Sequence, residues 1–337
     1  RGPGRAAPDG TDRRARGMAR RLLGAALYAM SLHLTAISAA AAPYVAGNRV
    51  FPSTPTTEDP FVAGEFSLGA TTMRHGASGD EPAFRDTEVS SELALRVTDD
   101  VSIGLEGTYV FHDPAGQPGS SGFGNLEAFI KYQFYVSDEH ELLLSAGVVH
   151  EFGGTGAERV GAESVGSTMP AVYFGKGFGD LPEGMKYLRP LAMTGSIGYE
   201  FADQRSHTTT EIDPDTGQAS LGVEHSPDIL VLGVALGYSL RYLQGNVDYI
   251  GLPPFIGRLT PVIEFAYETP VTKPYGAEPS GVIAPGFIYS GIGYDVGAEA
   301  LIPVTDAAGT GVGAIVKLNI FLDKYIPPLL PRPLLQR

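Results

Sequence analysis

Charged side chains recur at alternate positions along many stretches of this chain, and most of them are carboxylates. The acids at such positions are Glu88, Glu92, Glu106, Glu127, Glu200, Glu264, Glu268, Asp295 and Glu299, and the bases are Arg96, Lys131, Arg241 and Lys317. Carboxylates gathered on one wall would attract cations and repel anions. The alternative is that each charge only solvates its surface or pairs with an opposite charge on a neighbouring strand.

The sequence contains no motif typical of nucleophilic, metal or cofactor chemistry. His150 beside Glu151 and His112 beside Asp113 come nearest to a catalytic couple, but neighbouring strand residues face opposite ways. A Gly-x-Ser-x-Gly elbow, a phosphate loop and a His-Glu-x-x-His pair are all missing, and no cysteine offers a thiolate. The loop acids Glu211, Asp213 and Asp215 do not amount to a predicted Ca²⁺ site. We therefore expect no catalytic residue, metal or cofactor.

The stretches that carry these charges alternate for longer than an ordinary strand. In residues 101–112, Ile103, Leu105 and Tyr109 point one way, whereas Ser102 and Glu106 point the other. Strands of soluble proteins average about 5–6 residues, but crossing a bilayer takes roughly 9–11. The pattern therefore predicts strands that span a membrane.

Twelve such segments predict a closed, antiparallel, up-and-down β-barrel over residues 61–323. The segments are 61–73, 83–98, 101–112, 123–136, 141–152, 165–178, 187–202, 226–242, 257–269, 282–290, 293–304 and 311–322. Short turns such as 137–140 alternate with long polar loops, of which 203–225 is the longest, as periplasmic turns alternate with outer loops in bacterial barrels. Two connections fit poorly, because 243–256 is long for a turn and 305–310 is short for an outer loop.

A soluble β-sandwich or lipocalin-like barrel would also alternate, with its apolar face turned inward. The strand length, the many small residues on the polar face and the aromatic residues near strand ends favour the membrane barrel instead. These aromatic residues are Tyr109, Phe111, Tyr132, Phe134, Tyr199, Phe201 and Tyr267.

The first sixty residues read as processing and leader segments. We expect residues 1–17 to be untranslated or mis-assigned sequence, and 18–42 to be a signal peptide, because Arg20 and Arg21 precede an apolar run that ends in alanines. Residues 43–60 are rich in proline without periodicity, and could fold inward as a plug; 324–337 form a tail. After residue 42 the chain has 36 acidic and 17 basic residues, which argues against nucleic acid as a partner.

Two regions resemble an outer-membrane family named for the meta-pathway of phenol degradation. One is the strand from Gly122 to Phe134, which begins Gly-Phe-Gly-Asn-Leu and ends Lys-Tyr-Gln-Phe. The other is the C-terminal third, with Ile283–Tyr289, Gly297–Pro303, Gly311–Gly313 and Phe321–Asp323. Asn125 stands where that family has Asp, and Lys324 where a second Asp often follows. The resemblance implies an outer-membrane location and uptake of small, often aromatic, compounds.

We therefore expect an outer-membrane channel or transporter that passes small solutes through an acidic lumen lined by the thirteen charged residues above. Its partners would be outer-membrane lipid and the solute; the sequence leaves the oligomeric state open. Two other functions remain: a non-conducting structural or surface-display barrel, and a barrel-embedded hydrolase with Ser and His on one wall.

Overall fold

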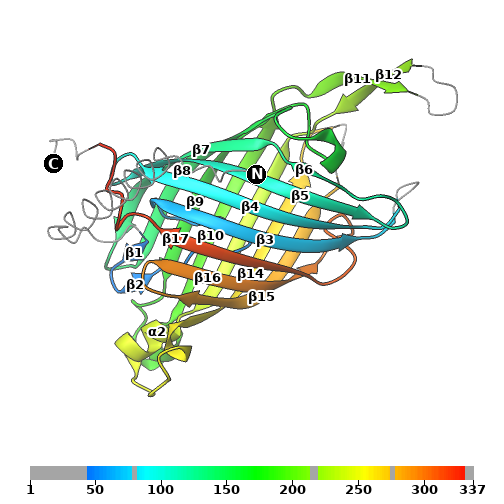
Figure 1. The fold of residues 1–337 in the computed structure, drawn as a ribbon. Coiled ribbons are helices and arrows are strands. Elements are labelled where there is room, and N and C mark those ends of the chain that lie inside the picture. Colours follow the sequence, from blue (N-terminus) through cyan, green and yellow to red (C-terminus); the bar gives the residue numbers. More distant parts are fainter. Residues whose placement is uncertain (1–43, 78–81, 213–218, 274–277, 331–337) are drawn as a thin grey trace, which may run out of the picture. The chain divides into compact units, whose positions relative to one another are not determined.

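The structure is a computed structural model that describes residues 44–77, 82–212, 219–273 and 278–330, and it shows a closed antiparallel β-barrel (Figure 1). Its twelve wall strands are β3 (Glu65–His75), β4 (Phe84–Arg96), β5 (Val101–Pro114), β7 (Leu126–Ser137), β8 (Leu142–Phe152), β9 (Ser167–Gly177), β10 (Leu191–Ala202), β13 (Ile229–Tyr238), β14 (Leu259–Pro270), β15 (Ser280–Ser290), β16 (Tyr294–Pro303) and β17 (Gly313–Phe321). Consecutive wall strands pair with each other, and β17 pairs with β3 to close the barrel. All twelve predicted strands are confirmed.

The barrel wall has an apolar outer face and a polar inner face. On the outside, Leu105 is 52 % exposed and Ile263 is 55 % exposed, as expected for side chains that meet acyl chains. On the inside, Glu264, Ser145 and Asn319 are at most 1 % exposed. Because a soluble barrel would bury the leucines and expose the carboxylates, the distribution excludes the sandwich and lipocalin-like alternatives.

The connections differ in length between the two ends of the barrel, as predicted. One end has turns such as 97–100 and 291–293; the other has longer loops that contain β6 (Ser120–Phe123), η1 (Glu158–Val160) and the hairpin β11 (Ser206–Ile212) and β12 (Ala219–His225). The connection 203–225, expected as a long polar loop, therefore contains a β-hairpin. Its Thr208–Thr210 run favours extended backbone, because β-branched residues suit strands. The acids Glu211, Asp213 and Asp215 lie outside the side chains that the structure describes.

The short-turn end also carries four of the short helices in the described part of the chain. They are η2 (Glu183–Leu188) between β9 and β10, and α2 (Leu240–Tyr242), η3 (Leu243–Val247) and η4 (Ile256–Arg258) between β13 and β14. Within the described residues, no helix has the length and apolar character needed to cross a bilayer. Residues 243–256 are a long connection because they fold into these helices, whereas a tight turn would suffice to join the strands.

The described leader begins with a small hairpin, β1 (Val45–Ala46) and β2 (Arg49–Val50), after which residues 51–64 run inside the barrel, in contact with inward-facing wall residues. Phe51, Phe61 and Ala63 pack there with Leu143 of the wall and Phe321 of β17. The wall itself begins at Glu65, four residues later than the predicted start of the first strand. Residues 61–64 were predicted to belong to this strand because they are mostly apolar, but they lie inside the barrel.

Candidate functional site

The most distinctive part of the barrel is its occupied lumen. We call residues 51–64, with the sequence FPSTPTTEDPFVAG, the plug. Phe51 and Val62 are fully buried, and Ser53 and Thr54 are 3 % exposed. The wall is shaped to admit the plug closely: a Cβ at Gly297 would collide with the Cγ of Pro55. The segment is therefore an integral part of the interior of this barrel, as the inward-folding hypothesis proposed.

Three carboxylates of the wall accept hydrogen bonds from the plug. Glu264 Oε2 accepts from the main-chain N of Thr57 at 2.6 Å, from Thr57 Oγ1 at 2.7 Å and from the main-chain N of Thr56 at 3.2 Å. The Thr56 hydroxyl donates to Glu299 at 2.6 Å, and the main-chain N of Ser53 donates to Asp295 at 2.9 Å. These acids thus satisfy main-chain groups that would otherwise be buried without a partner.

Two lysines of the wall hold the plug by its oxygens. Lys131 Nζ donates to the Asp59 carbonyl at 2.9 Å and lies 3.4 Å from a Glu58 carboxylate oxygen. Lys317 Nζ donates to the Thr54 carbonyl at 3.1 Å. Five of the residues predicted to line the lumen therefore contact the plug: Lys131, Lys317, Glu264, Asp295 and Glu299.

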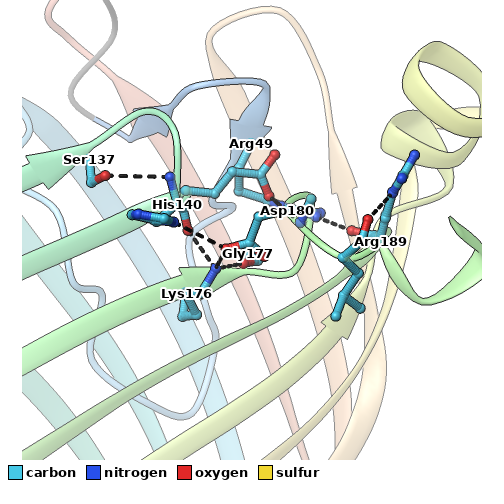
Figure 2. Close-up of polar contacts among 10 residues, drawn as sticks. Arg49, Ser137, His140, Lys176, Gly177, Asp180 and Arg189 are labelled. Carbon is cyan, nitrogen blue, oxygen red and sulfur yellow. Dashed lines mark hydrogen bonds and ion pairs between the residues drawn. The ribbon is translucent and has the colours of Figure 1, made fainter. Parts of the chain in front are cut away.

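At the short-turn end, Arg49 fastens the start of the plug to the barrel (Figure 2). It is 1 % exposed, its Nε lies 3.2 Å from Glu141, and its other nitrogens donate to the carbonyls of Arg189 and Pro190. Its guanidinium also stacks 3.9 Å from the ring centroid of Tyr242. One buried cation thus joins the leader to three separate connections of the wall.

Near Arg49, the residues Ser137, His140 and Asp180 form a cluster whose residue types match those of a catalytic triad (Figure 2). His140 Nδ1 lies 3.3 Å from Asp180, and Lys176 Nζ donates to Asp180 at 3.0 Å, which lowers the pKa of that carboxyl. Ser137 Oγ, however, accepts from the main-chain N of His140 at 3.4 Å and not from its ring. Because a nucleophilic serine needs the imidazole itself, this cluster lacks the geometry of a triad.

The two catalytic couples considered from the sequence, His150 with Glu151 and His112 with Asp113, are likewise not formed. His112 bonds to Asp86 across the β4–β5 pair at 2.7 Å, and His150 bonds to Thr168 at 3.0 Å. Each histidine turns away from the acid that follows it in sequence, as the alternation of a strand requires.

Above the plug, on the long-loop side, the lumen opens into an acidic vestibule. A cavity of about 440 Å³ is lined by Glu88, Glu127, Glu151 and Glu200, among other residues. A smaller cavity of about 60 Å³ lies between Glu92, Glu106, Glu127 and the Glu58–Lys131 contact of the plug. The vestibule therefore ends where the plug begins.

Two further predicted lining residues, Glu268 and Arg96, lie at opposite ends of the lumen. Glu268 shares the inward register of Glu264 on β14, four residues nearer the long loops. Arg96, 7 % exposed, ends β4 at the short-turn side and contacts Asp99 at 2.8 Å and Asp323 at 3.4 Å. Arg241 must be corrected: β13 ends at Tyr238, so Arg241 is an exposed residue of α2 and not of a wall strand.

Sequence reasoning missed the plug's own contributions to this network. Asp59 accepts hydrogen bonds from the Ser53 hydroxyl at 2.8 Å and from the main-chain N of Thr54 at 2.9 Å, and so shapes the tight S-T-P-T-T turn. Arg49 and Glu141 were not singled out either, although they are paired and buried. The only signal was the proline content of the leader, which shows that it is extended but not what it touches.

No protein-family model matches the chain, and no curated protein matches its sequence. Several solved structures are similar in fold. An outer membrane channel from Pseudomonas putida F1 has a TM-score of 0.51 and 10 % identity, covering 81 % of this chain and 99 % of that chain. The KdgM porin has a TM-score of 0.41 and 10 % identity, covering 76 % of this chain and 98 % of that one. With its lipid-facing apolar wall and polar interior, the chain is an outer-membrane β-barrel.

Proposed function

We propose that this protein is an outer-membrane channel for small solutes, and that the plug is its gate. The acidic vestibule receives the solute from the long-loop side, and displacement of residues 51–64 opens the way to the short-turn side. The resemblance in Gly122–Phe134 and in the C-terminal third supports small, hydrophobic or aromatic compounds as the solutes. An export signal at residues 18–42 belongs to the same proposal.

The observation that carries the proposal is the polar attachment of the plug. Its Thr56–Thr57 turn, its Thr54 and Asp59 carbonyls and its Ser53 amide are all held by hydrogen bonds to wall side chains. Such bonds exchange for bonds to water with a net cost of only about 0.5–1.5 kcal/mol each. A plug held in this way can move out of the lumen when water or solute forms hydrogen bonds with the same donors and acceptors.

A disulfide lock tests the gate directly, because the chain contains no cysteine. A Cβ built at Gly233 would lie 3.3 Å from the Cβ of Thr57, which is close to disulfide geometry. In planar bilayers, the variant Thr57→Cys with Gly233→Cys should conduct when reduced and lose its conductance when oxidised. The reduced and oxidised forms of the same variant serve as each other's control.

Equal conductance of the two forms would show that solutes do not pass where the plug sits. The second function, a non-conducting structural barrel, is favoured by the close fit of the plug against Gly297. If the protein is such a non-conducting barrel, neither the reduced nor the oxidised form of the double-cysteine variant conducts, and removal of residues 43–60 opens no channel.

A further inference from the structure

A second, unrelated feature lies at the short-turn end, where two connections form an apolar projection. We call residues 183–188 and 240–258 the foot. Tyr249 is 81 % exposed, Phe255 is 60 % exposed and Met185 is 51 % exposed, and Ile292 of the adjacent turn is 75 % exposed. The two connections are joined by a hydrogen bond from the Tyr187 hydroxyl to Asp248 at 2.9 Å. An aqueous surface does not account for so many large apolar side chains in one place.

The foot is continuous with the lipid-facing wall. Phe255 stacks on Tyr289 of β15 with ring centroids 5.0 Å apart, and Tyr289 lies 6.3 Å from Tyr294 at the start of β16. The Tyr238 hydroxyl, at the end of β13, donates to the Tyr187 carbonyl at 3.0 Å. Tyrosine and phenylalanine at strand ends form the interfacial girdle of membrane barrels. The aromatic residues of the foot extend this girdle beyond the strands.

The foot also contains a basic cavity of about 490 Å³, which Arg241, Arg258, Gln244, Tyr249 and Ile292 line in part. The ion pairs of the described residues do not include either arginine. Among the described residues, neither guanidinium group has a carboxylate oxygen within 4.0 Å, although the charge of Arg241 acts on Asp295 from a greater distance. Two arginines that line one cavity without a close ion pair are unexpected in a protein whose net charge is −14. Guanidinium groups bind phosphate oxygens through paired N–H donors.

We propose that this cavity binds the phosphate of an anionic phospholipid, and that the foot lies in the headgroup region of the leaflet at the short-turn end. Arg241 and Arg258 contact the phosphate, and Tyr249, Phe255 and Ile292 meet the start of the acyl chains. The Oε1 of Gln244 accepts a hydrogen bond from the main-chain N of Leu252 at 2.7 Å, and its Nε2 donates to the glycerol. A ligand of this kind, polar at one end and apolar at the other, matches the two characters of the site.

Tryptophan fluorescence tests the position of the foot, because the chain has no tryptophan. The full chain with Tyr249→Trp is folded into phosphatidylglycerol-containing vesicles, and Leu221→Trp in the exposed hairpin serves as the matched control. The emission of the Tyr249→Trp variant should be quenched by phospholipids brominated near the headgroup and protected from iodide; the emission of the Leu221→Trp variant should show the reverse. Iodide quenching of the Tyr249→Trp variant without quenching by brominated lipid would place the foot in water, as a soluble partner's surface would be, and would overturn the proposal.

The phosphate site is tested by counting phosphatidylglycerol molecules retained by the folded barrel in native mass spectrometry. Arg241→Gln with Arg258→Gln should lose the retained lipid, whereas Arg74→Gln with Arg85→Gln, which removes two exposed charges from neighbouring strands at the opposite end, should keep it. Excess glycerol phosphate should not displace the lipid, since it lacks acyl chains. Displacement would indicate a site for free anions, and equal retention by the two double variants would show that the cavity is not the lipid site.

Discussion

Glu264 shows how much of the plug's position depends on one side chain. A single carboxylate oxygen accepts three hydrogen bonds from Thr56 and Thr57, and the residue is fully buried. Replacement by alanine would leave these donors without a partner, at a cost of about 1–3 kcal/mol for each. Since about 1.4 kcal/mol changes an equilibrium tenfold, the open fraction should rise at least tenfold.

We therefore expect Glu264→Ala to increase the open probability in single-channel recordings, and Glu264→Gln, which keeps an acceptor oxygen, to stay close to the parent protein. Glu268→Ala is the matched control, because Glu268 has the same inward register on β14 and no described contact with the plug. If Glu268→Ala opened the channel as much as Glu264→Ala, the effect would come from the loss of a carboxylate charge, and not from the loss of the hydrogen bonds between Glu264 and the plug.

Arg49 provides a second prediction, on the anchor of the plug. Removing one partner of a buried ion pair costs about 3–5 kcal/mol because the other charge is left uncompensated. Arg49→Met should therefore loosen the leader and expose residues 44–64 to proteolysis while the barrel stays folded. The double variant Arg49→Met with Glu141→Gln should regain part of the protection, and equal cleavage of the single and double variants would contradict the ion-pair explanation.

Among the elements, the wall strands and the β11–β12 hairpin differ in what they contribute to the fold. β10 and β13 pair directly from Leu191–Tyr238 to Glu200–Ile229, whereas β11 and β12 pair with each other in a separate sheet. Replacing residues 206–225 by a short glycine-serine link should leave the thermal unfolding of the barrel unchanged within about 0.5 kcal/mol, as for other changes away from the core. A large loss of stability would show that the hairpin supports the wall.

The same contrast explains what could be predicted from the sequence. Each wall strand has one face in lipid and one in a polar interior, so its alternation over ten or more residues is unambiguous. The β11 strand of the hairpin has no such alternation, because its sequence from Ser206 to Glu211 is polar at every position. Strand order also followed from the connections, because adjacent antiparallel strands need only short turns.

The plug could not be traced in the same manner. Its contacts join residues that are 71 to 263 positions apart, such as Val62 with Gln133 and Lys317 with Thr54. No local pattern encodes such distances; proline and threonine show only that the segment is not helical. The charged lining residues could be named from strand parity, but Arg241 could not be placed, because nothing marked the end of β13 four residues before the predicted end of that strand.

For the whole molecule, the charges of the lumen are divided between its two halves. The bases Lys131 and Lys317 are engaged with the plug, whereas Glu88, Glu127, Glu151 and Glu200 line the open vestibule. The part of the lumen that a solute meets first is therefore more acidic than the overall composition indicates. Because carboxylates in a low-dielectric channel attract cations and repel anions, the open channel should prefer cations.

This preference predicts a measurable effect of neutralising the vestibule. With unequal salt on the two sides of a planar bilayer, the open channel should give a reversal potential of the sign expected for cations. Glu127→Gln with Glu200→Gln should move that potential toward zero, because two of the five carboxylates that line the vestibule are removed. Glu158→Gln in the exposed η1 removes a charge on the same side of the barrel but outside the cavity, and should leave the potential unchanged. Anion selectivity in the parent protein would contradict the inward placement of the acids, whereas an equal effect of Glu158→Gln would assign the preference to surface charge.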